Sequence, residues 1–594
     1  MKPRHPPHII LSAWRSRLLV ALLLLGLTGL AGRAAYLQGM HNGFLQQKGE
    51  SRYSRILEMS AHRGMITDRH GEPLAISTPV ESVWSSPQDM NATPEQLGKL
   101  ANLIGLDAAE VRRRLDGSHL EGSKHGRQHN SPHGSKRDFV YLKRHLSPDV
   151  AARVVGLNMP GIFLKREYRR YYPAGELTAH VLGFTDVDDK GQEGIELAWQ
   201  DELAGKPGSR RVIKDRKGRV VEDVESIQSP KSGENIALSL DSKIQYLAYR
   251  ELSQAVEINR AKAGGIVVLD AQTGEVLALV NLPTYNPNNR MNMNGGRARN
   301  RALTDVFEPG STLKPFTIAA ALESGGVKPD TIFETAPGTF SIGKATIRDA
   351  HEEGQLTVAQ VIQKSSNVGS AKIALSLPPQ TLWEMLSGAG FGAPTGSGFP
   401  GEVSGKLRPH HTWRPIEQAT MSYGHGIAVS LLQLARAYTL FSGEGELKPV
   451  SLVKLESPPA GKRVLSRETA LAVSRMLETV AQPGGTAMQA QVSGYRVAGK
   501  TGTAHKLEGN GYAKNRYLST FVGYAPASNP RFVIAVMLDE PSAGKYFGGT
   551  VAAPVFSRVM AGVLRLRNVP NDAPVPSVMS LTAAPGPKQD KGDV

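Results

Sequence analysis

The sequence predicts an α+β fold for residues 232–567, the largest part of this chain of 594 residues. Two pairs of strand-like runs stand at the ends of this part, residues 265–270 with 275–280 and residues 519–524 with 532–536. Helical patterns lie between the two pairs, at residues 316–322, 358–362, 431–440 and 469–480. Strands at both ends with helices inserted between them favour one sheet that is covered by a helical cluster.

Length, charge and composition narrow the class of protein. A chain this long is expected to form two or more folded units. Its formal net charge of +16 favours anionic surroundings such as acidic polymers, anionic lipid or nucleic acid. The chain has no cysteine, which excludes disulfides, a thiol nucleophile and a zinc–thiolate site. Its arginines are not interleaved with aromatic residues that could stack on bases, so we do not expect nucleic-acid binding.

The N-terminus contains an apolar segment, residues 18–37, that follows four lysines and arginines and no acidic residue. It has about the 20 residues that a tilted membrane helix needs, and Arg33 can extend its charge to the interface. Small residues near the end of the segment also fit a cleavable signal. Because Tyr36 and Leu37 prolong the apolar surface, we expect a retained anchor. The positive-inside rule then leaves residues 1–17 in the cytoplasm and exports everything downstream.

A change of composition near Ser232 separates residues 232–567 from a preceding unit, residues 38–231. This preceding unit contains charged stretches, punctuated by glycine, with several short strand-like runs. At the other end of the chain, residues 568–594 are rich in Pro and Ala, and we expect a disordered tail there.

Residues 121–136 are basic, low in complexity and broken by Gly and Pro, so we expect a solvated loop. His125, His129 and His133 fall at positions i, i+4 and i+8 of this loop. On a helix this spacing would form a metal-binding stripe, but the Gly and Pro residues argue against a helix. We therefore do not predict a metal site in the loop.

The segment from Glu308 to Ser311 and Lys314 (EPGSTLK) carries the sharpest local motif. An apolar helical pattern starts at the serine, and the N–H groups of a helix N-terminus favour negative charge that develops beside Ser311. Residues i and i+3 share a helix face, which lets Lys314 reach the Ser311 hydroxyl. A partly buried lysine near other cations has a lowered pKa and can act as a base. Alone, such a motif is more often a helix cap followed by a surface lysine.

Two further motifs follow in the chain. Ser365-Ser-Asn367 lies at a break between two apolar runs, where side chains can point into a cleft. Lys500-Thr-Gly-Thr503 has the pattern of an exposed strand with a glycine at a close approach. The order Ser-x-x-Lys, Ser-x-Asn, Lys-Thr-Gly is the signature of penicillin-binding proteins and class A β-lactamases.

A phosphate-binding loop is the rival interpretation of Lys500, because residues 494–501 match G-x-x-x-x-G-K-[ST]. That loop needs a helix that opens at its Lys-Thr pair. The residues after Thr501 are rich in glycine and begin no helical pattern, so we reject this interpretation. His351 and the pair at 410–411 lack the second helical histidine of a zinc hydrolase, and no metal site is predicted there.

With these motifs the chain resembles a class B penicillin-binding protein over nearly its whole length. Residues 63–69, 170–175 and 194–205 resemble motifs of the non-catalytic region of that class. Residues 517–524 and 546–556 resemble the division-specific peptidoglycan D,D-transpeptidase (FtsI type) more than the elongation type. The resemblance implies a penicillin-binding-protein/serine β-lactamase-like transpeptidase domain, with an antiparallel sheet and a helical cluster. An elongated, mostly β pedestal of the dimerisation type and one transmembrane helix would precede it.

The same resemblance implies a role for each residue of the three motifs. Ser311 would attack the penultimate D-Ala carbonyl of a stem pentapeptide, releasing D-Ala and forming an acyl-enzyme, and Lys314 would accept the serine proton. Ser365, near Lys500, would relay a proton to the leaving amine, and Asn367 would bind the acyl amide. An amine from a neighbouring stem peptide would then complete the cross-link.

The substrate-binding residues implied by the resemblance are Thr501, Gly502 and Thr503, with Lys500 beside them at the terminal carboxylate of the substrate. The backbone N–H groups of Ser311 and Thr503 would form the oxyanion hole. β-Lactams would acylate the same serine. No metal or organic cofactor is expected.

The implied partners are peptidoglycan stem pentapeptides, β-lactams, a SEDS-type glycosyltransferase (FtsW-like) and other divisome membrane proteins. The implied location is the bacterial inner membrane at the division septum, with a single pass and a periplasmic catalytic domain. A D,D-carboxypeptidase, an elongation-type transpeptidase and a divisome scaffold without activity stay open as alternatives. A β-lactamase is disfavoured because it would rarely carry a pedestal and a retained anchor.

Overall fold

The structure is a computed structural model that describes residues 13–37, 54–87, 90–116, 139–214, 220–291, 293–509 and 511–575. The chain forms two compact units, which are described separately. Unit 1 comprises Met1–His62, Pro79–Glu167 and Gly205–Ser232, and unit 2 comprises Arg63–Thr78, Tyr168–Ala204 and Gly233–Val594. The chain therefore enters unit 2 twice before residue 232, and the domain boundaries given above stay a prediction.

The apolar N-terminal segment forms one long helix, α1 (Ala13–Ala35). Its 23 residues are long and apolar enough to cross a membrane, and none of them is buried within the described structure. An isolated helix with apolar side chains on every face is unstable in water, whereas a bilayer solvates it. By length and composition α1 is a candidate membrane anchor.

The rest of unit 1 combines strands with helices that had not been expected from the sequence. One antiparallel sheet has the order β1–β6–β7. In a second group, β3 pairs with β4 and β5, and three helices pack around the fully buried residues Val83, Leu100 and Leu142. The start of β3 and the end of β5 belong to unit 2. The bounds are β1 Ser54–Met59, β3 Pro73–Ser85, α3 Pro94–Ile104, α4 Ala108–Leu115, β4 Val140–Leu146, α5 Pro148–Gly156, β5 Ile162–Tyr171, β6 Gly208–Lys214 and β7 Val220–Gln228.

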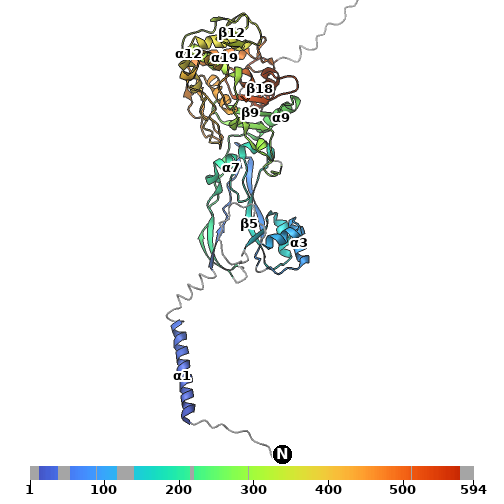
Figure 1. The fold of residues 1–594 in the computed structure, drawn as a ribbon, viewed down its shortest axis with the longest axis vertical. Helices are drawn as coiled ribbons and strands as arrows, with labels where there is room; N and C mark the ends of the chain where they lie inside the picture. The colour runs from blue at the N-terminus through green and yellow to red at the C-terminus, as the bar shows by residue number, and fades with distance from the viewer. Residues whose placement is uncertain are drawn as a thin grey trace, which may run out of the picture. The chain divides into compact units, whose positions relative to one another are not determined.

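A five-stranded antiparallel sheet forms the centre of unit 2, with the order β10–β9–β19–β18–β17 (Figure 1). Both hairpins expected from the sequence are present, and the pairing of β19 with β9 joins them into one sheet. The edge strand β17 is the one that contains Lys500. The bounds are β9 Ala263–Asp270, β10 Val276–Leu282, β17 Ala498–Glu508, β18 Gly511–Ala525 and β19 Phe532–Asp539.

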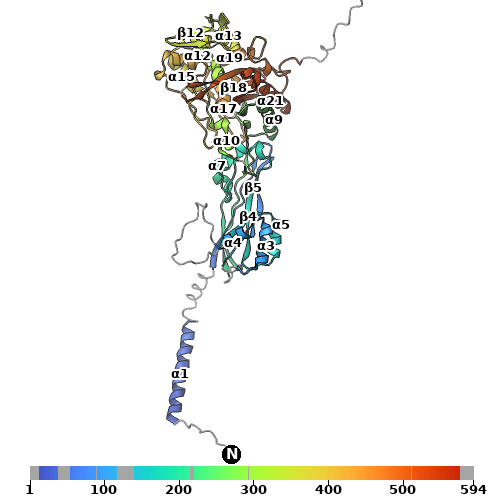
Figure 2. The same cartoon turned by 45° about the vertical axis from the view of Figure 1, so that its right-hand side comes forward.

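Helices cover both faces of this sheet, which explains why β9, β10 and β19 are buried along nearly their whole length and are mostly apolar. The long helices α9 (Ser242–Ile258) and α21 (Ala553–Leu566) pack together against one face (Figure 2). Helix α17 (Leu431–Ala437) packs on β9 and β19, and the helical cluster α12 (Lys314–Glu323), α13 (Val358–Lys364), α15 (Pro379–Gly388) and α19 (Arg467–Thr479) gathers away from α9. The predicted sheet with a helical cluster is confirmed.

Shorter elements complete unit 2. The remaining helices are α6 Ala179–Leu182, α7 Gly194–Ala198, α8 Gln200–Ala204, α10 Gly295–Ala298, α11 Arg301–Thr304, α14 Asn367–Leu375, α16 Pro415–Met421, α18 Thr439–Ser442 and α20 Gly548–Val551. The 3-10 helices are η2 Gly175–Leu177, η3 Gly310–Leu313, η4 His410–Thr412 and η5 Met488–Ala490. The remaining strands are β2 Ile66–Thr67, β8 Ile236–Ala237, β11 Ile332–Glu334, β12 Thr339–Ile342, β13 Ala345–Arg348, β14 Gln355–Thr357, β15 Glu446–Leu447 and β16 Lys462–Arg463.

A buried ionic cluster joins three segments of unit 2 that come from the motifs of the non-catalytic region. The Nη2 atom of Arg63 lies 2.7 Å from Oε2 of Glu196, and Nε of Arg170 lies 2.6 Å from Oε1 of the same carboxylate. These three side chains are at most 1% exposed. One carboxylate pairs with both guanidinium groups, so each buried charge needs the others to be in place. The cluster therefore holds the three segments together.

Two expectations fall wholly or partly outside the described residues. The histidine-containing loop, residues 121–136, and the end of the tail, residues 576–594, are among the residues that the structure does not describe. The start of the predicted tail is ordered: the Tyr495 hydroxyl donates to the carbonyl of Val569 at 2.6 Å, and the carboxylate of Asp572 accepts from the N–H of Arg496 at 2.7 Å. Val569 and Asp572 therefore contact the segment at Tyr495 and Arg496, and the extent of a disordered tail stays a prediction.

Candidate active site

Ser311 lies in the 3-10 turn η3, one turn before the α-helix α12 begins at Lys314. The sequence predicted a helix start at the serine, and the structure places a tighter turn there. Gly310 has a positive φ of 56°, which a glycine adopts without steric cost, and Pro309 precedes it. The first turn of the segment is thereby tightened, and Ser311 stays partly accessible while its neighbours Thr312 and Leu313 are buried.

Lys314 is fully buried and joins the first two motifs. Its Nζ atom lies 3.0 Å from Oγ of Ser311, so the spacing i and i+3 does bring the amine to the hydroxyl. The same Nζ donates to Oδ1 of Asn367 at 2.8 Å and to Oγ of Ser365 at 3.2 Å, and it also contacts the Ser365 carbonyl. All the polar contacts of this amine are therefore directed at residues of the predicted site.

Ser365 lies between the two lysines of the site. It ends helix α13 in the left-handed conformation, with φ 63°, and this turn carries its side chain out of the helix. Its hydroxyl lies 2.9 Å from Nζ of Lys500 and 3.2 Å from Nζ of Lys314. A hydroxyl in contact with two amines can pass a proton between them.

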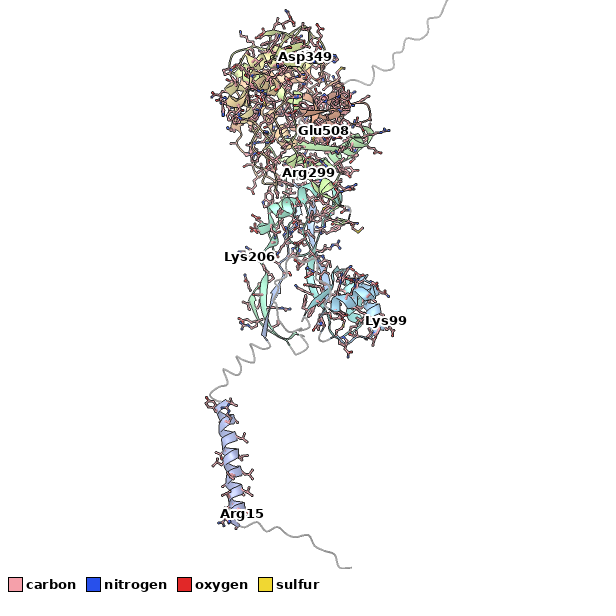
Figure 3. The ribbon with its side chains drawn as sticks, in the orientation of Figure 1. Arg15, Lys99, Lys206, Arg299, Asp349 and Glu508 are labelled. Carbon is pink, nitrogen blue, oxygen red and sulfur yellow. The ribbon has the colours of Figure 1, made fainter. Side chains whose placement is uncertain are left out.

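Asp349 fixes the second motif, and no pattern in the sequence had pointed to it. Its carboxylate accepts from the Ser366 hydroxyl at 2.6 Å, from the N–H of Val368 at 2.9 Å and from the N–H of Asn367. These groups form the N-terminus of helix α14, where a carboxylate also complements the helix dipole. Figure 3 labels Asp349 within the helical cluster. Asn367 is further held by its Nδ2, which donates to the carbonyl of Arg348 at 2.8 Å.

The third motif is the edge strand β17, as the sequence predicted, and not a phosphate loop. Lys500 is fully buried inside the strand and pairs in register with Val522. Gly502 lies against the turn of the nucleophile: a Cβ atom at this position would lie 2.8 Å from the carbonyl oxygen of Pro309 and 2.9 Å from Cγ2 of Thr312. Glycine is thus required for the close approach of β17 to η3.

The two threonines of the third motif are held by neighbouring groups. The Thr501 hydroxyl lies 3.0 Å from the Thr486 hydroxyl, and the Thr503 hydroxyl accepts from the N–H of Gly548 at 3.0 Å. A stack of aromatic rings follows at this end of the site, with 4.0 Å between the ring centroids of Tyr517 and Tyr546. The segments at 517–524 and 546–556, which carried part of the resemblance, therefore meet beside Thr503.

Burial changes the protonation of both lysines. Burial and the nearby charge of Lys500 hold the pKa of Lys314 well below its usual range. Burial alone lowers the pKa of Lys500 to about 7. A buried lysine with a lowered pKa can be neutral and accept the proton of a serine hydroxyl, which is the role expected of Lys314.

A second group of polar side chains lies beside the nucleophile and was missed from the sequence. Gly424 packs against the backbone of Gly310. The N–H of Gly310 donates to the carbonyl of Gly424 at 3.3 Å. The next residue, His425, lies with Nδ1 3.6 Å from Oε2 of Glu308, and 3.3 Å from the hydroxyl of Tyr512. These side chains come from segments far apart in the sequence, so no local pattern could have joined them.

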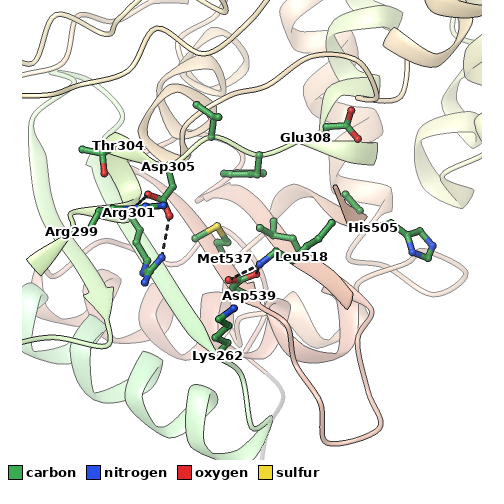
Figure 4. Close-up of a pocket in the computed structure, with 14 residues that line it drawn as sticks. Lys262, Arg299, Arg301, Thr304, Asp305, Glu308, His505, Leu518, Met537 and Asp539 are labelled. Carbon is green, nitrogen blue, oxygen red and sulfur yellow. Dashed lines mark hydrogen bonds and ion pairs between the residues drawn. The ribbon is translucent and has the colours of Figure 1, made fainter. Parts of the chain in front are cut away.

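A cavity of about 590 Å³ lies beyond Glu308, bounded by the segment that precedes Ser311 and by β17, β18 and β19 (Figure 4). Its charged groups are paired with one another: Arg301 lies 3.1 Å from Asp305, and Lys506 lies 2.8 Å from Asp539. Because these charges already have partners, we assign no ligand to the cavity. Among the described residues no group of three or more His, Asp or Glu side chains could hold a metal ion.

Comparisons with known proteins agree with this geometry. The pattern of the penicillin binding protein transpeptidase domain matches residues 264–561, and that of the penicillin-binding protein dimerisation domain matches residues 58–238. The chain is 42% identical to the peptidoglycan D,D-transpeptidase FtsI of Escherichia coli (strain K12), over 96% of this chain and 95% of that protein. It is also 42% identical to the probable peptidoglycan D,D-transpeptidase PenA of Neisseria gonorrhoeae, over 92% and 91% of the two chains.

A solved structure matches the transpeptidase part. The apo structure of the transpeptidase domain of Burkholderia pseudomallei penicillin-binding protein 3 is 52% identical, with a TM-score of 0.53. The match covers 57% of this chain and 98% of that chain. The fold of the sheet and the helical cluster is therefore that of a penicillin-binding transpeptidase domain.

Proposed function

This chain belongs to the class B penicillin-binding proteins, and from that membership we propose that it is a peptidoglycan D,D-transpeptidase whose nucleophile is Ser311. One observation carries the assignment of the nucleophile. The three motifs converge through Ser365, whose hydroxyl contacts Lys500 at 2.9 Å and Lys314 at 3.2 Å, while Lys314 contacts Ser311 at 3.0 Å. The chain of contacts runs from one lysine to the other and ends at the serine.

The first half of the reaction is acylation of Ser311. Lys314 in its neutral form takes the proton of the serine hydroxyl as Oγ attacks the carbonyl carbon of the penultimate D-Ala. The developing oxyanion is stabilised by the N–H groups of Ser311 and Thr503, a type of contact whose loss typically costs roughly 100- to 1,000-fold in rate. Gly310 and Thr503 lie close together, since a Cβ atom on this glycine would lie 3.6 Å from the Thr503 carbonyl.

The leaving group is the amine of the terminal D-Ala. Ser365 donates its hydroxyl proton to this nitrogen and regains one from Lys314, with which it is in contact. Lys500, Thr501 and Thr503 bind the terminal carboxylate of the donor peptide, and Asn367 binds the acyl amide with the Nδ2 hydrogen that the Arg348 carbonyl leaves available. Attack by an acceptor amine then releases Ser311 and forms the cross-link.

The finer location and partners are also part of the proposal. We propose that α1 anchors the chain in the bacterial inner membrane with the N-terminus in the cytoplasm and the catalytic domain in the periplasm, at the division septum. The support is the positive charge before α1 and the identity to a protein named FtsI. A SEDS-type glycosyltransferase (FtsW-like) and other divisome membrane proteins are the proposed partners. A fluorescent fusion that stays off the constriction site during division would refute the septal location.

Analysis of reaction products tests the type of reaction. The full-length chain in detergent is given a donor pentapeptide and an acceptor peptide with a free side-chain amine, and the products are separated by mass. A cross-linked dimer together with released D-Ala is expected for a transpeptidase. Trimmed tetrapeptide alone would identify a D,D-carboxypeptidase, and the absence of any product, together with failure to react with penicillin, would favour the scaffold alternative.

A further inference from the structure

The cluster of His425, Glu308 and Tyr512 is a carboxylate–imidazole pair that is held on both sides. The Nδ1 atom of His425 lies 3.6 Å from Oε2 of Glu308 and 3.3 Å from the Tyr512 hydroxyl. The same hydroxyl donates to Oε2 of Glu308 at 3.0 Å, and Oε1 of Glu308 accepts from the N–H of Gly426 at 2.8 Å. Both of these polar contacts of the ring involve Nδ1, and this arrangement fixes the ring and directs its other nitrogen away from the pair.

This pair flanks the nucleophile from two segments. Glu308 precedes Ser311 by three residues, and His425 follows Gly424, which is packed directly against the backbone of Gly310. A Cβ atom at Gly424 would overlap the backbone of Gly310, so the loop that carries His425 approaches the turn of the nucleophile more closely than any residue but glycine would allow. Lys314 is close enough to His425 to affect its titration.

The reaction needs a second base beside Lys314, since Lys500 is assigned to the terminal carboxylate of the donor peptide. An acceptor amine of the lysine type has a pKa of about 10.4 and reaches the site as an ammonium ion. Such an ion must lose one proton before its nitrogen can attack the acyl-enzyme, and a second as the amide forms. Lys314 can take only one of these, because it has to return a proton to Oγ of Ser311 when the ester bond breaks.

We propose that His425 takes the first of these protons, so that the acceptor ammonium becomes a nucleophilic amine beside the acyl-enzyme. This inference rests on the proposed function. In the step, the ammonium gives one proton to the free ring nitrogen of His425, and Glu308 stabilises the imidazolium. The neutral nitrogen then bonds to the acyl carbon, the bond from that carbon to Oγ of Ser311 breaks, and the second proton passes through Lys314 to Oγ. The imidazolium loses its proton to solvent through the exposed 27% of the side chain.

The surroundings of His425 suit a base. Burial lowers its pKa below the usual value, with Lys314 and His505 acting in the same direction, while the carboxylate of Glu308 opposes them. The other titratable groups that face the ring are Tyr423 and Tyr512. The ring is therefore neutral at pH 7 and able to accept a proton. His425 can act as a base at pH values above its pKa, and it loses this capacity as the pH falls through that pKa.

The test separates attack by amine from attack by water on the same acyl-enzyme. The full-length chain in detergent is acylated with a peptide thioester that ends in D-Ala, an acceptor peptide with a free lysine side-chain amine is supplied, and amide and acid products are quantified. For His425→Gln we expect the ratio of amide to acid at pH 7.5 to fall roughly 100-fold, the size of a general-base effect. For His411→Gln, the same change at an exposed histidine, the ratio should match that of the wild type.

Dependence on pH distinguishes a base from a packing residue. Without His425 the amine must arrive already neutral, so the ratio for His425→Gln should rise about tenfold per pH unit and approach the wild-type ratio near pH 10. A ratio that is unchanged at pH 7.5, or reduced by the same factor at every pH, would overturn the proposal.

A second variant covers the case in which His425→Gln does not fold. Glu308→Gln keeps an oxygen for the N–H of Gly426 and removes the charge that stabilises the imidazolium. We expect its ratio of amide to acid to be several-fold lower, with the acid limb of its pH profile shifted to lower pH. An acid limb at the wild-type position would contradict the proposal. Failure of the proposed function itself is seen separately, as a wild-type chain that benzylpenicillin does not acylate.

Discussion

The Nζ atom of Lys500 lies 2.9 Å from Oγ of Ser365, although 135 residues separate the two in the chain. This contact joins the edge strand of the sheet to the end of helix α13. Lys314 reaches the same hydroxyl, so Ser365 contacts both of these buried lysines. The acylation rate is therefore expected to depend on the contacts of Ser365 with the two lysines.

Replacing Ser365 by Ala should slow acylation by benzylpenicillin roughly 100-fold or more, because the route of the proton between lysine and leaving nitrogen is lost. The neighbouring variant Ser366→Ala is a matched control. Its hydroxyl donates to Asp349 and accepts from the N–H of Gly369, so it caps helix α14 without touching a lysine. We expect Ser366→Ala to lower the free energy of unfolding by about 1 kcal/mol and to retain most of the acylation rate. Equal rates for the two variants would contradict the role of Ser365.

Gly502→Ala should separate β17 from the turn of the nucleophile. The added methyl group would lie 2.8 Å from the Pro309 carbonyl, so the strand or the turn has to move. We expect a loss of about 1–3 kcal/mol in stability, typical of overpacking, together with a fall in the acylation rate of at least tenfold. Gly511→Ala in the adjacent strand is the control, since a Cβ atom there meets nothing within 4 Å. A Gly502→Ala variant as active and as stable as Gly511→Ala would refute the close approach.

Lys500→Met should make stability less dependent on pH. Burial lowers the pKa of Lys500 to about 7, whereas the unfolded chain has an ordinary lysine pKa near 10.4. Between these values the unfolded state binds one proton more, so Lys500 makes the wild type gain stability as the pH rises. The free energy of unfolding of the wild type, minus that of Lys500→Met, should increase by about 1.4 kcal/mol per pH unit from pH 7.5 to 10. Denaturant titrations at several pH values measure this difference, and a flat line would exclude the lowered pKa.

Glu196→Ala should destabilise unit 2 by about 3–5 kcal/mol, because two buried guanidinium groups, those of Arg63 and Arg170, lose their shared carboxylate. The control is Glu95→Ala in helix α3, whose carboxylate pairs with Lys99 at the surface and should leave stability nearly unchanged (Lys99 is labelled in Figure 3). Thermal unfolding of the two variants compares them directly. Similar melting temperatures would mean that the buried cluster is dispensable.

Features that depend on neighbours in the chain could be predicted from the sequence. The i and i+3 spacing brings Lys314 to Ser311, and Asp241 caps helix α9 by accepting from the N–H of Lys243 at 2.9 Å. The strand at Lys500 could be predicted because the segment after it is rich in glycine and has no helical pattern. The exact start of the helix was not predictable in the same way, since Gly310 with its positive φ tightens the first turn into η3.

Features that depend on tertiary contact could not be predicted. Asp349 lies in no recognisable motif. It holds the second motif in place only because helix α14 begins beside it in the fold. The pairing of His425 with Glu308 requires the loop after α16 to pack on the turn of the nucleophile. Strand β8 covers two residues, because it pairs with β2 over that length before the chain reaches Asp241, the cap of α9. Such contacts join segments whose distance in the sequence carries no signal.

Mass spectrometry of the chain after reaction with benzylpenicillin tests the central claim most directly. The wild type should gain the mass of one penicilloyl group, and digestion should place it on the peptide that contains Ser311. Ser311→Ala should fold and gain no mass. A label on another residue, or an equal label on Ser311→Ala, would contradict the assignment of Ser311 as the nucleophile.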